Sequence, residues 1–145
     1  MPTPTSIPSL RPAALADIPA VLAFWRHAAE DAHRPADSAS ALEVLLARDP
    51  GALILAEDDA RTLLGTVIAG WDGWRCHLYR LAVAESHRRR GIGRLLLDAA
   101  EARFRAFGAT RADAMVLDEN SLAHHAWTAR GYTPQAEWSR WVKSL

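Results

Sequence analysis

The sequence has a single cysteine, no long apolar run and no excess of charge of either sign. Because Cys76 stands alone, an internal disulfide and a cysteine-rich metal site are excluded, and a reducing, cytoplasmic setting is expected. No apolar stretch approaches the length of a membrane-spanning helix, and residues 1–8 lack the basic and apolar regions of a signal peptide. Lysine plus arginine equals aspartate plus glutamate, at 17 each, so no overall field attracts the chain to nucleic acid or membrane.

The length of 145 residues suits one domain with a hydrophobic core. We expect a single domain over residues 1–145, of which residues 1–6 form a flexible lead. No repeat, linker or low-complexity segment divides the chain.

Apolar periodicity and turn signals predict an alternation of strands and helices. The predicted helices cover 15–29, 38–48, 92–107 and 121–129. The predicted strands cover 7–11, 52–57, 63–71, 74–83, 112–117 and 138–142. This order predicts an α/β fold with a mixed central sheet, flanking helices and one β-α-β crossover over 74–117.

The stretch Arg88-Arg89-Arg90-Gly91-Ile92-Gly93-Arg94 lies between the strand over 74–83 and the amphipathic helix that follows. A helix beginning at such a turn presents unpaired N–H groups at the positive end of its dipole, where phosphate binds. The glycines allow a ligand to approach the main chain closely, and the arginines add positive charge. A solvated basic turn is the alternative. A dinucleotide fingerprint would need a third glycine where Leu96 stands, and a P-loop would need Gly-Lys-Ser or Gly-Lys-Thr, which is absent.

Two motifs together resemble the Gcn5-related N-acetyltransferase (GNAT) superfamily. Arg88, Gly91 and Gly93 match its acetyl-CoA signature, Arg/Gln-x-x-Gly-x-Gly/Ala. Farther along, Asn120 and Ala123 match Asn-x-x-Ala, and Gly131-Tyr132 matches the glycine-aromatic pair that closes the last helix. The resemblance covers nearly the whole chain in element order. It implies a mostly antiparallel sheet whose fourth and fifth strands splay apart, with the acetyl thioester in the gap.

The resemblance also implies acetyl-CoA as co-substrate and indicates which residues hold it. Main-chain groups of the fourth strand would bond the pantetheine amides, the glycine turn would hold the pyrophosphate, and the last helix would face the pantetheine arm. Asn120 is alternatively, or also, the N-cap of that helix. The residues expected to bind the cofactor are Leu81, Ala82, Val83, Arg88, Arg89, Arg90, Gly91, Ile92, Gly93, Arg94, Asn120, Ala123 and Trp127.

The sequence departs from the family pattern at both positions of proton transfer. Trp127 stands where the family usually has a tyrosine acid, and the fourth strand has no glutamate base. Strand alternation places His77, Tyr79, Leu81 and Val83 on one side, so His77 and Tyr79 are the predicted catalytic residues. The alternatives are an exposed histidine and a core tyrosine.

No metal is expected, since the adjacent His124 and His125 point in different directions on a helix. Trp71 and Trp74 are read as a cross-strand pair or as one wall of the acceptor pocket. Acidic residues of the loop between the first two helices, Glu30, Asp31 and Asp37, either attract a cationic amine or are simply solvated.

These features together predict an N-acetyltransferase that transfers acetyl directly to a primary amine of a small molecule or a protein. The acceptor itself is not readable from the sequence. The alternative is a CoA-sensing module that acts on a protein partner. Pairing into a homodimer, common among similar proteins, is left open.

Overall fold

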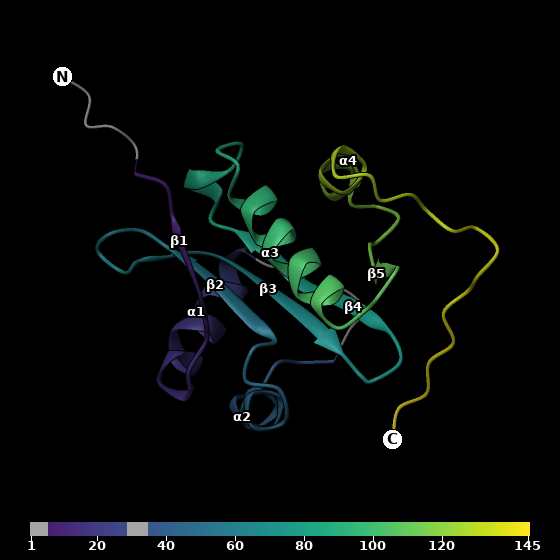
Figure 1. Cartoon of the computed structure of the whole chain (residues 1–145), viewed down its shortest axis with the longest axis horizontal. Helices are drawn as coiled ribbons and strands as arrows, with labels where there is room; N and C mark the ends of the chain where they lie inside the picture. The colour runs from purple at the N-terminus through teal and green to yellow at the C-terminus, as the bar shows by residue number, and fades with distance from the viewer. Residues whose placement is uncertain (1–5, 29–34) are drawn as a thin grey trace. The chain divides into compact units, whose positions relative to one another are not determined.

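The structure, a computed structural model, describes residues 6–28 and 35–145. The chain divides into two compact units, one up to Met115 and one from Val116 onward. The first unit holds a five-stranded sheet in the order β1-β2-β3-β4-β5, antiparallel throughout except between β4 and β5 (Figure 1). The predicted α/β class with a mixed, mostly antiparallel sheet is confirmed. Within residues 6–28 and 35–145, no helix is long and apolar enough to cross a membrane.

The elements of the first unit follow the predicted order. They are β1 (Ser9–Pro12), a 3-10 turn (Leu15–Asp17), α1 (Ile18–Ala28), α2 (Ala39–Arg48), β2 (Leu53–Glu57), β3 (Leu63–Trp71), β4 (Cys76–Val83), a second 3-10 turn (Glu85–His87), α3 (Ile92–Ala106) and β5 (Ala112–Ala114).

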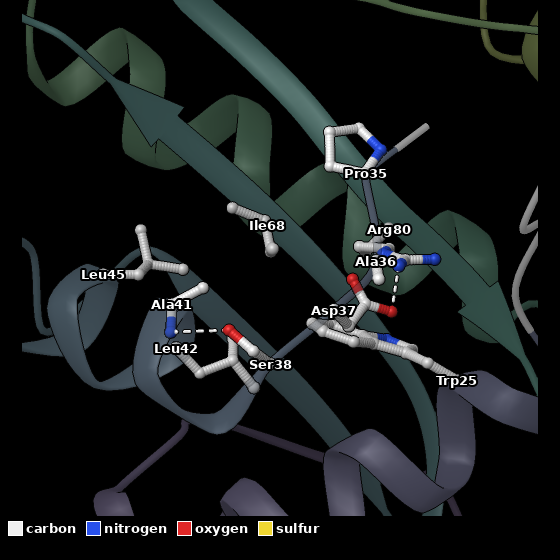
Figure 2. A pocket seen from close by; sticks show the side chains of 10 residues that line it. All are labelled: Trp25, Pro35, Ala36, Asp37, Ser38, Ala41, Leu42, Leu45, Ile68 and Arg80. Carbon is white, nitrogen blue, oxygen red and sulfur yellow. Dashed lines mark hydrogen bonds and ion pairs between the residues drawn. The ribbon is translucent and has the colours of Figure 1, made fainter. Parts of the chain in front are cut away.

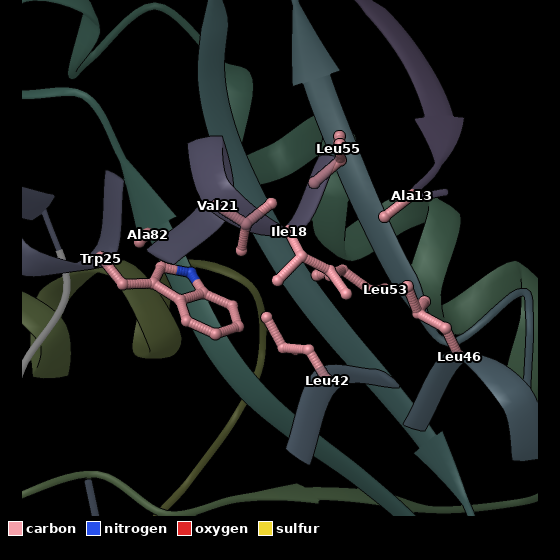
Figure 3. Close-up of a cluster of buried hydrophobic side chains, with 9 residues drawn as sticks. All are labelled: Ala13, Ile18, Val21, Trp25, Leu42, Leu46, Leu53, Leu55 and Ala82. Carbon is pink, nitrogen blue, oxygen red and sulfur yellow. The ribbon is translucent and has the colours of Figure 1, made fainter. Parts of the chain in front are cut away.

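One face of the sheet packs against the apolar stripes of α1 and α2 (Figure 3). Trp25 of α1 is 2% exposed and lies among aliphatic side chains of both helices and of β2. Burying a large apolar side chain stabilises the fold by about 1.5–3 kcal/mol, so this cluster fixes the helices on the sheet. Its members are Ala13, Ile18, Val21, Trp25, Leu42, Leu46, Leu53, Leu55 and Ala82.

The other face of the sheet is covered by α3. Ile92, Leu96, Leu97, Ala100 and Phe104 are its buried residues. Helical spacing in the sequence predicts that Leu95, Ala99 and Phe107 also point inward, and for Phe107 this prediction is wrong, since it is 42% exposed. The buried side of α3 follows the i, i+4 positions from Ile92 to Phe104. Leu95 and Ala99 lie at the edges of this side and are half-buried.

Phe107 instead stacks on Trp71, with ring centroids 5.5 Å apart and planes inclined by 10°. The predicted pair of Trp71 with Trp74 is therefore wrong. β3 ends at Trp71, whose partner in β4 is Cys76, so Trp74 lies in the connecting turn. Trp74 is 72% exposed and lies under the guanidinium of Arg75.

Arg103 of α3 fastens the helix to the sheet and to the segment before β2. Its Nε donates to the carbonyl of Ala69 at 3.2 Å, its terminal nitrogen pairs with Asp49, and its guanidinium lies 4.8 Å from the centre of the Phe107 ring. The Arg103 and Asp49 side chains are only 18% and 24% exposed, so this pair is partly shielded from water.

Replacing Arg103 with methionine is expected to lower the free energy of unfolding by about 2 kcal/mol, because the carbonyl and the carboxylate lose a charged donor. Urea denaturation measures the change. Arg105→Met is the matched control: Arg105 is 72% exposed and its pair with Glu101 is a surface i,i+4 contact, worth about 0.5 kcal/mol or less. Equal losses in both variants would contradict the fastening role.

The second unit contains one helix, α4 (Ser121–Ala129). Asn120 Oδ1 accepts a hydrogen bond from the Ala123 amide at 3.0 Å, so the predicted N-cap is confirmed. The predicted strand over 138–142 is wrong: residues 139–145 have no regular secondary structure, and Trp138 and Trp141 are 74% and 92% exposed. A strand needs a neighbour for its main-chain hydrogen bonds, and this unit contains no other strand.

Candidate functional site

The turn between β3 and β4 is organised by Asp72. Its Oδ1 accepts hydrogen bonds from the amides of Trp74 and Arg75, both at 2.7 Å, and these bonds lower the pKa of its carboxyl group. Gly73 has a φ of +90°, which favours glycine. Asp72-Gly73 between two strand-like segments predicts a hairpin, and the structure confirms it, with residues 72–75 as the connection between β3 and β4.

β4 and β5 pair over only a short length. Their parallel register joins Cys76 to Ala112, His77 to Asp113 and Leu78 to Ala114, where β5 ends. The rest of β4, from Tyr79 to Val83, extends beyond the last of these pairs. A strand-like ligand added beside this part of β4 would bond to its main chain.

A bulge interrupts the alternation of β4. Tyr79 is opposite Ile68 and Ala82 is opposite Thr66, so the two residues 80–81 face a single residue of β3. Arg80, the first of the two, has a φ of +54°, which is uncommon for a residue with a side chain.

The bulge overturns the predicted grouping of four β4 residues on one side. Tyr79 is paired with Ile68, which packs on the α1–α2 cluster, whereas a Cβ on Gly93 of α3 would lie 3.8 Å from Val83 Cγ2. His77 and Tyr79 therefore lie on the α1–α2 side of the sheet, and Val83 lies on the α3 side. An inserted residue reverses the alternation, which periodicity alone does not reveal.

His77 lies between two carboxylates. Its Nδ1 is 2.7 Å from Asp113 Oδ1 on β5, and its Nε2 is 3.4 Å from Asp72 Oδ2. The hydrogen bond with Asp113, reinforced by the charges of both acids, raises the pKa of His77 against the opposing effect of partial burial. Such a histidine is a stronger base than a free one, and its ring orientation is fixed from β5.

Tyr79 is 46% exposed and its ring centre lies 6.1 Å from that of His77. The interpretation of Tyr79 as a core aromatic is therefore wrong. The two predicted catalytic side chains lie next to one another, near the last β4–β5 pair, Leu78 with Ala114.

A cavity of about 230 Å³ lies between α1, α2 and the bulge (Figure 2). Most of its lining is apolar, but Arg80 and Asp37 form an ion pair on its wall, with the guanidinium 4.7 Å from the centre of the Trp25 ring. The side chain of Arg80 is 7% exposed. Asp37 is therefore a partner of a buried arginine rather than a solvated loop acid, while Glu30 and Asp31 lie outside the described residues.

The predicted phosphate turn lies between the second 3-10 turn, which follows β4, and α3. Gly91 is the N-cap of α3 with a φ of +83°, and no side chain caps the helix. The Leu95 amide donates to the Gly91 carbonyl at 3.0 Å, so the amides of residues 92–94 precede the first intrahelical bond. Arg89 also has a positive φ, of 64°. A basic turn with uncapped amides can hold a phosphate.

The arginines of the turn are not equivalent. Arg88 folds back so that its Nε donates to the Val83 carbonyl at 3.2 Å, which ties the turn to the end of β4. Arg94 is 70% exposed and only 3.9 Å from Asp98 on the next helical turn. Arg90 and Arg94 line a cavity of about 740 Å³ beside the turn, so these two are placed to meet an anion.

The second unit carries the other predicted cofactor residues. Asn120 and Ala123 are joined by the capping hydrogen bond, and Trp127 packs edge-on against Tyr132 with ring centres 5.0 Å apart. His124 is bound to the Leu117 carbonyl at 2.8 Å through Nε2. Among residues 6–28 and 35–145, no group of three or more histidine, cysteine, aspartate or glutamate side chains is arranged to hold a metal ion.

Two residues of this site, Asp113 and Arg80, were not predicted from the sequence. Asp113 meets His77 only through strand pairing between residues far apart in the chain. Arg80 is marked in the sequence only as a charged residue within an apolar strand, a signal that does not reveal its bulge.

The comparisons with known proteins agree with this geometry. The model of the family described as "Acetyltransferase (GNAT) family" matches residues 19–132. An acetyltransferase of Yersinia pseudotuberculosis is 32% identical over 120 residues, which are 82% of this chain and 83% of that protein. The PaiA N-acetyltransferase of Thermoplasma acidophilum, solved with coenzyme A, has a similar structure with a TM-score of 0.77 at 18% identity, over 90% of this chain and 92% of that one.

A second solved structure extends this likeness. The aminoglycoside 6'-N-acetyltransferase of Acinetobacter haemolyticus superposes with a TM-score of 0.73 at 19% identity, over 94% of this chain and 99% of that one. The likeness to both structures concerns the fold, and the family rests on the sequence matches. The chain belongs to the acetyltransferase (GNAT) family and is an acetyl-CoA-dependent acetyltransferase.

Proposed function

We propose that the protein transfers the acetyl group of acetyl-CoA directly to a primary amine within a ternary complex. The observation that carries this proposal is the order of three features along β4 and the turn after it: the His77–Asp113 pair, the stretch of β4 beyond its pairs with β5, and the uncapped glycine turn at Gly91. They offer a base, a docking edge and a phosphate site in that order.

The cofactor would lie along β4 as an added strand. Main-chain groups of Leu81, Ala82 and Val83 would bond the pantetheine amides, and amides of residues 89–94 would hold the pyrophosphate. We assign Asn120, Ala123 and Trp127 to the same ligand on the strength of the family motif alone.

The chemistry needs one proton acceptor. The amine nitrogen attacks the thioester carbonyl carbon, the C–N bond forms, and the C–S bond then breaks with release of the CoA thiolate. A primary amine titrates near pH 10, so a base must take its proton, and we assign this role to His77, with Tyr79 as relay or acceptor contact. Solvent protonates the thiolate, since the indole of Trp127 does not ionise in this range.

The test is to incubate the protein with acetyl-CoA and a panel of polyamines, amino sugars, amino acids and peptide amines, and to follow free thiol. Acceptor-dependent thiol release supports the proposal. Tight acetyl-CoA binding without release over the whole panel contradicts it and supports the alternative, a CoA-sensing module.

Tyr79→Phe is expected to lower kcat about tenfold with little change in the KM of the acceptor, because only the hydroxyl is lost and the exposed ring remains. Steady-state kinetics at saturating acetyl-CoA measure both constants. A raised acceptor KM at unchanged kcat would assign Tyr79 to acceptor binding, and unchanged constants would leave it no role in turnover.

A further inference from the structure

A buried chain of hydrogen bonds runs from α1 to the bulge of β4. Trp25 Nε1 donates to Thr66 Oγ1 at 2.9 Å, and Thr66 Oγ1 donates to the carbonyl of Arg80 at 2.8 Å. The indole N–H is only a donor and the hydroxyl has a single proton, so the direction of both bonds is fixed. Thr66 is 0% exposed and Trp25 is 2% exposed.

The chain ends on one particular peptide group. No cis peptide occurs in the part of the chain that the structure describes, so the peptide joining Arg80 to Leu81 is trans. In a trans peptide the C=O and N–H point in opposite directions. Because the Arg80 carbonyl points at Thr66, the Leu81 N–H points away from it. Leu81 also lies beyond Leu78, where pairing with β5 ends.

We propose that Trp25 and Thr66 are positioning residues that orient and polarise the Arg80–Leu81 peptide, so that the Leu81 N–H stabilises the oxyanion formed from the acetyl thioester. The proposal rests on the proposed function. Hydrogen bonds in a chain strengthen one another, and a donor fixed before the reaction needs no reorganisation when charge develops.

The side chain of Arg80 provides a second anchor for the same peptide. Its ion pair with Asp37 and its position over the Trp25 ring hold a residue whose φ of +54° is otherwise unfavourable. The bulge is thus held through its carbonyl and through its side chain.

Packing alone does not account for this arrangement. Valine would fill much the same space as Thr66, and a buried hydroxyl or indole N–H is costly unless it is bonded. The two hydrogen bonds of Trp25 and Thr66 lead to a single carbonyl, that of Arg80. This arrangement indicates that the pair orients the Arg80–Leu81 peptide and does more than fill the core.

The test compares Thr66→Val with Thr66→Ser. Valine keeps the shape but cannot bond the Arg80 carbonyl, and we expect kcat to fall about tenfold while the KM of acetyl-CoA stays within about twofold. Serine keeps the hydroxyl and is expected to retain most of the rate. Trp25→Phe removes the first bond and also part of the packing under Arg80, and its kcat is expected to lie between those of Thr66→Val and Thr66→Ser.

A spectroscopic measurement tests the same peptide without an acceptor. The carbonyl ¹³C resonance of bound [1-¹³C]acetyl-CoA is expected to be shifted downfield in the wild type and in Thr66→Ser, and to move towards its free value in Thr66→Val. Val21→Ala is the control, because it thins the same buried cluster, in which Val21 is 0% exposed, without touching the chain of bonds. It should lose stability and keep both kcat and the resonance.

Two results separate the possible failures. If the wild type turns over and Thr66→Val matches Thr66→Ser in kcat and resonance, the positioning role is overturned. If no acceptor supports thiol release, the proposed function fails, while the resonance of bound acetyl-CoA still decides whether Thr66 acts on the carbonyl.

Discussion

Gly91→Val is expected to weaken acetyl-CoA binding about a hundredfold or more while the protein still folds. The turn at Gly91 presents the amides of residues 92–94 without a side-chain cap, and a branched side chain at the N-cap would stand between these amides and a pyrophosphate. Loss of two hydrogen bonds to a charged group, at about 1.5 kcal/mol each, corresponds to roughly a hundredfold in affinity. Isothermal titration calorimetry measures the dissociation constant.

The φ of +83° at Gly91 makes a control necessary, because valine is strained there whatever it does to the ligand. Gly108 provides it: its φ is +85°, a Cβ would likewise meet nothing within 4 Å, and it follows the other end of α3. Gly108→Val should lose a similar amount of stability, about 1–2 kcal/mol, and keep its affinity for acetyl-CoA. Equal weakening of binding in both variants would show that strain, not the ligand contact, is responsible.

Gly93 separates the two effects further. It has no positive φ, and an added Cβ would lie 3.8 Å from Val83 Cγ2, an ordinary contact. Gly93→Ala is therefore free of backbone strain and improves helix propensity. Weaker acetyl-CoA binding in this variant would come from the ligand side alone, which supports close approach of the pyrophosphate to the main chain.

The parts of the site that were predictable from sequence are those fixed by neighbouring residues. The glycine turn, the start of α3 at Ile92, the turn at Asp72 and the cap at Asn120 each depend on the chemistry of a few consecutive residues. Local rules on glycine conformation, capping and helical spacing are enough to place them, and the structure confirms all four.

The parts that were not predictable depend on contacts between distant segments. The bulge at Arg80 arises in the pairing of β3 with β4, and Asp113 reaches His77 only because β5 runs beside β4. The predicted strand over 138–142 fails for a related reason, since alternating apolar residues make a strand only where a partner is present. A pattern in one segment does not determine what lies beside it in space.

One of these long-range contacts, between Asp113 and His77, concerns the base that is missing from the family pattern. Trp127 replaces the usual tyrosine, and β4 has no glutamate, but Asp113 of β5 supplies a carboxylate to the neighbouring strand. A histidine supported in this way can accept a proton where a glutamate would otherwise do so. We infer that the proton leaves through His77 on the α1–α2 side of the sheet.

His77→Gln is expected to lower kcat about a hundredfold, the lower end of the range for general acid–base catalysis. Because Asp113 raises the pKa of His77, the wild-type kcat should fall on the acidic side as His77 becomes protonated, at a pH above the ordinary histidine value. Asp113→Asn removes the principal cause of the raised pKa and should move this acidic limb to lower pH. The pH dependence of kcat, measured with one acceptor throughout, tests both variants, because any titration of the amine itself is then common to all.

The stability of the protein should depend on pH in the opposite sense. A raised pKa in the folded state means that the contribution of the His77–Asp113 pair is fully present below about pH 6.5 and is lost as pH rises through the folded value. Urea denaturation of the wild type against His77→Gln across this range should show a difference that shrinks with rising pH, while the difference in kcat grows. An acidic limb that is unmoved in Asp113→Asn, together with a stability difference that follows pH as stated, would make His77 a structural ion-pair partner and exclude it as the base.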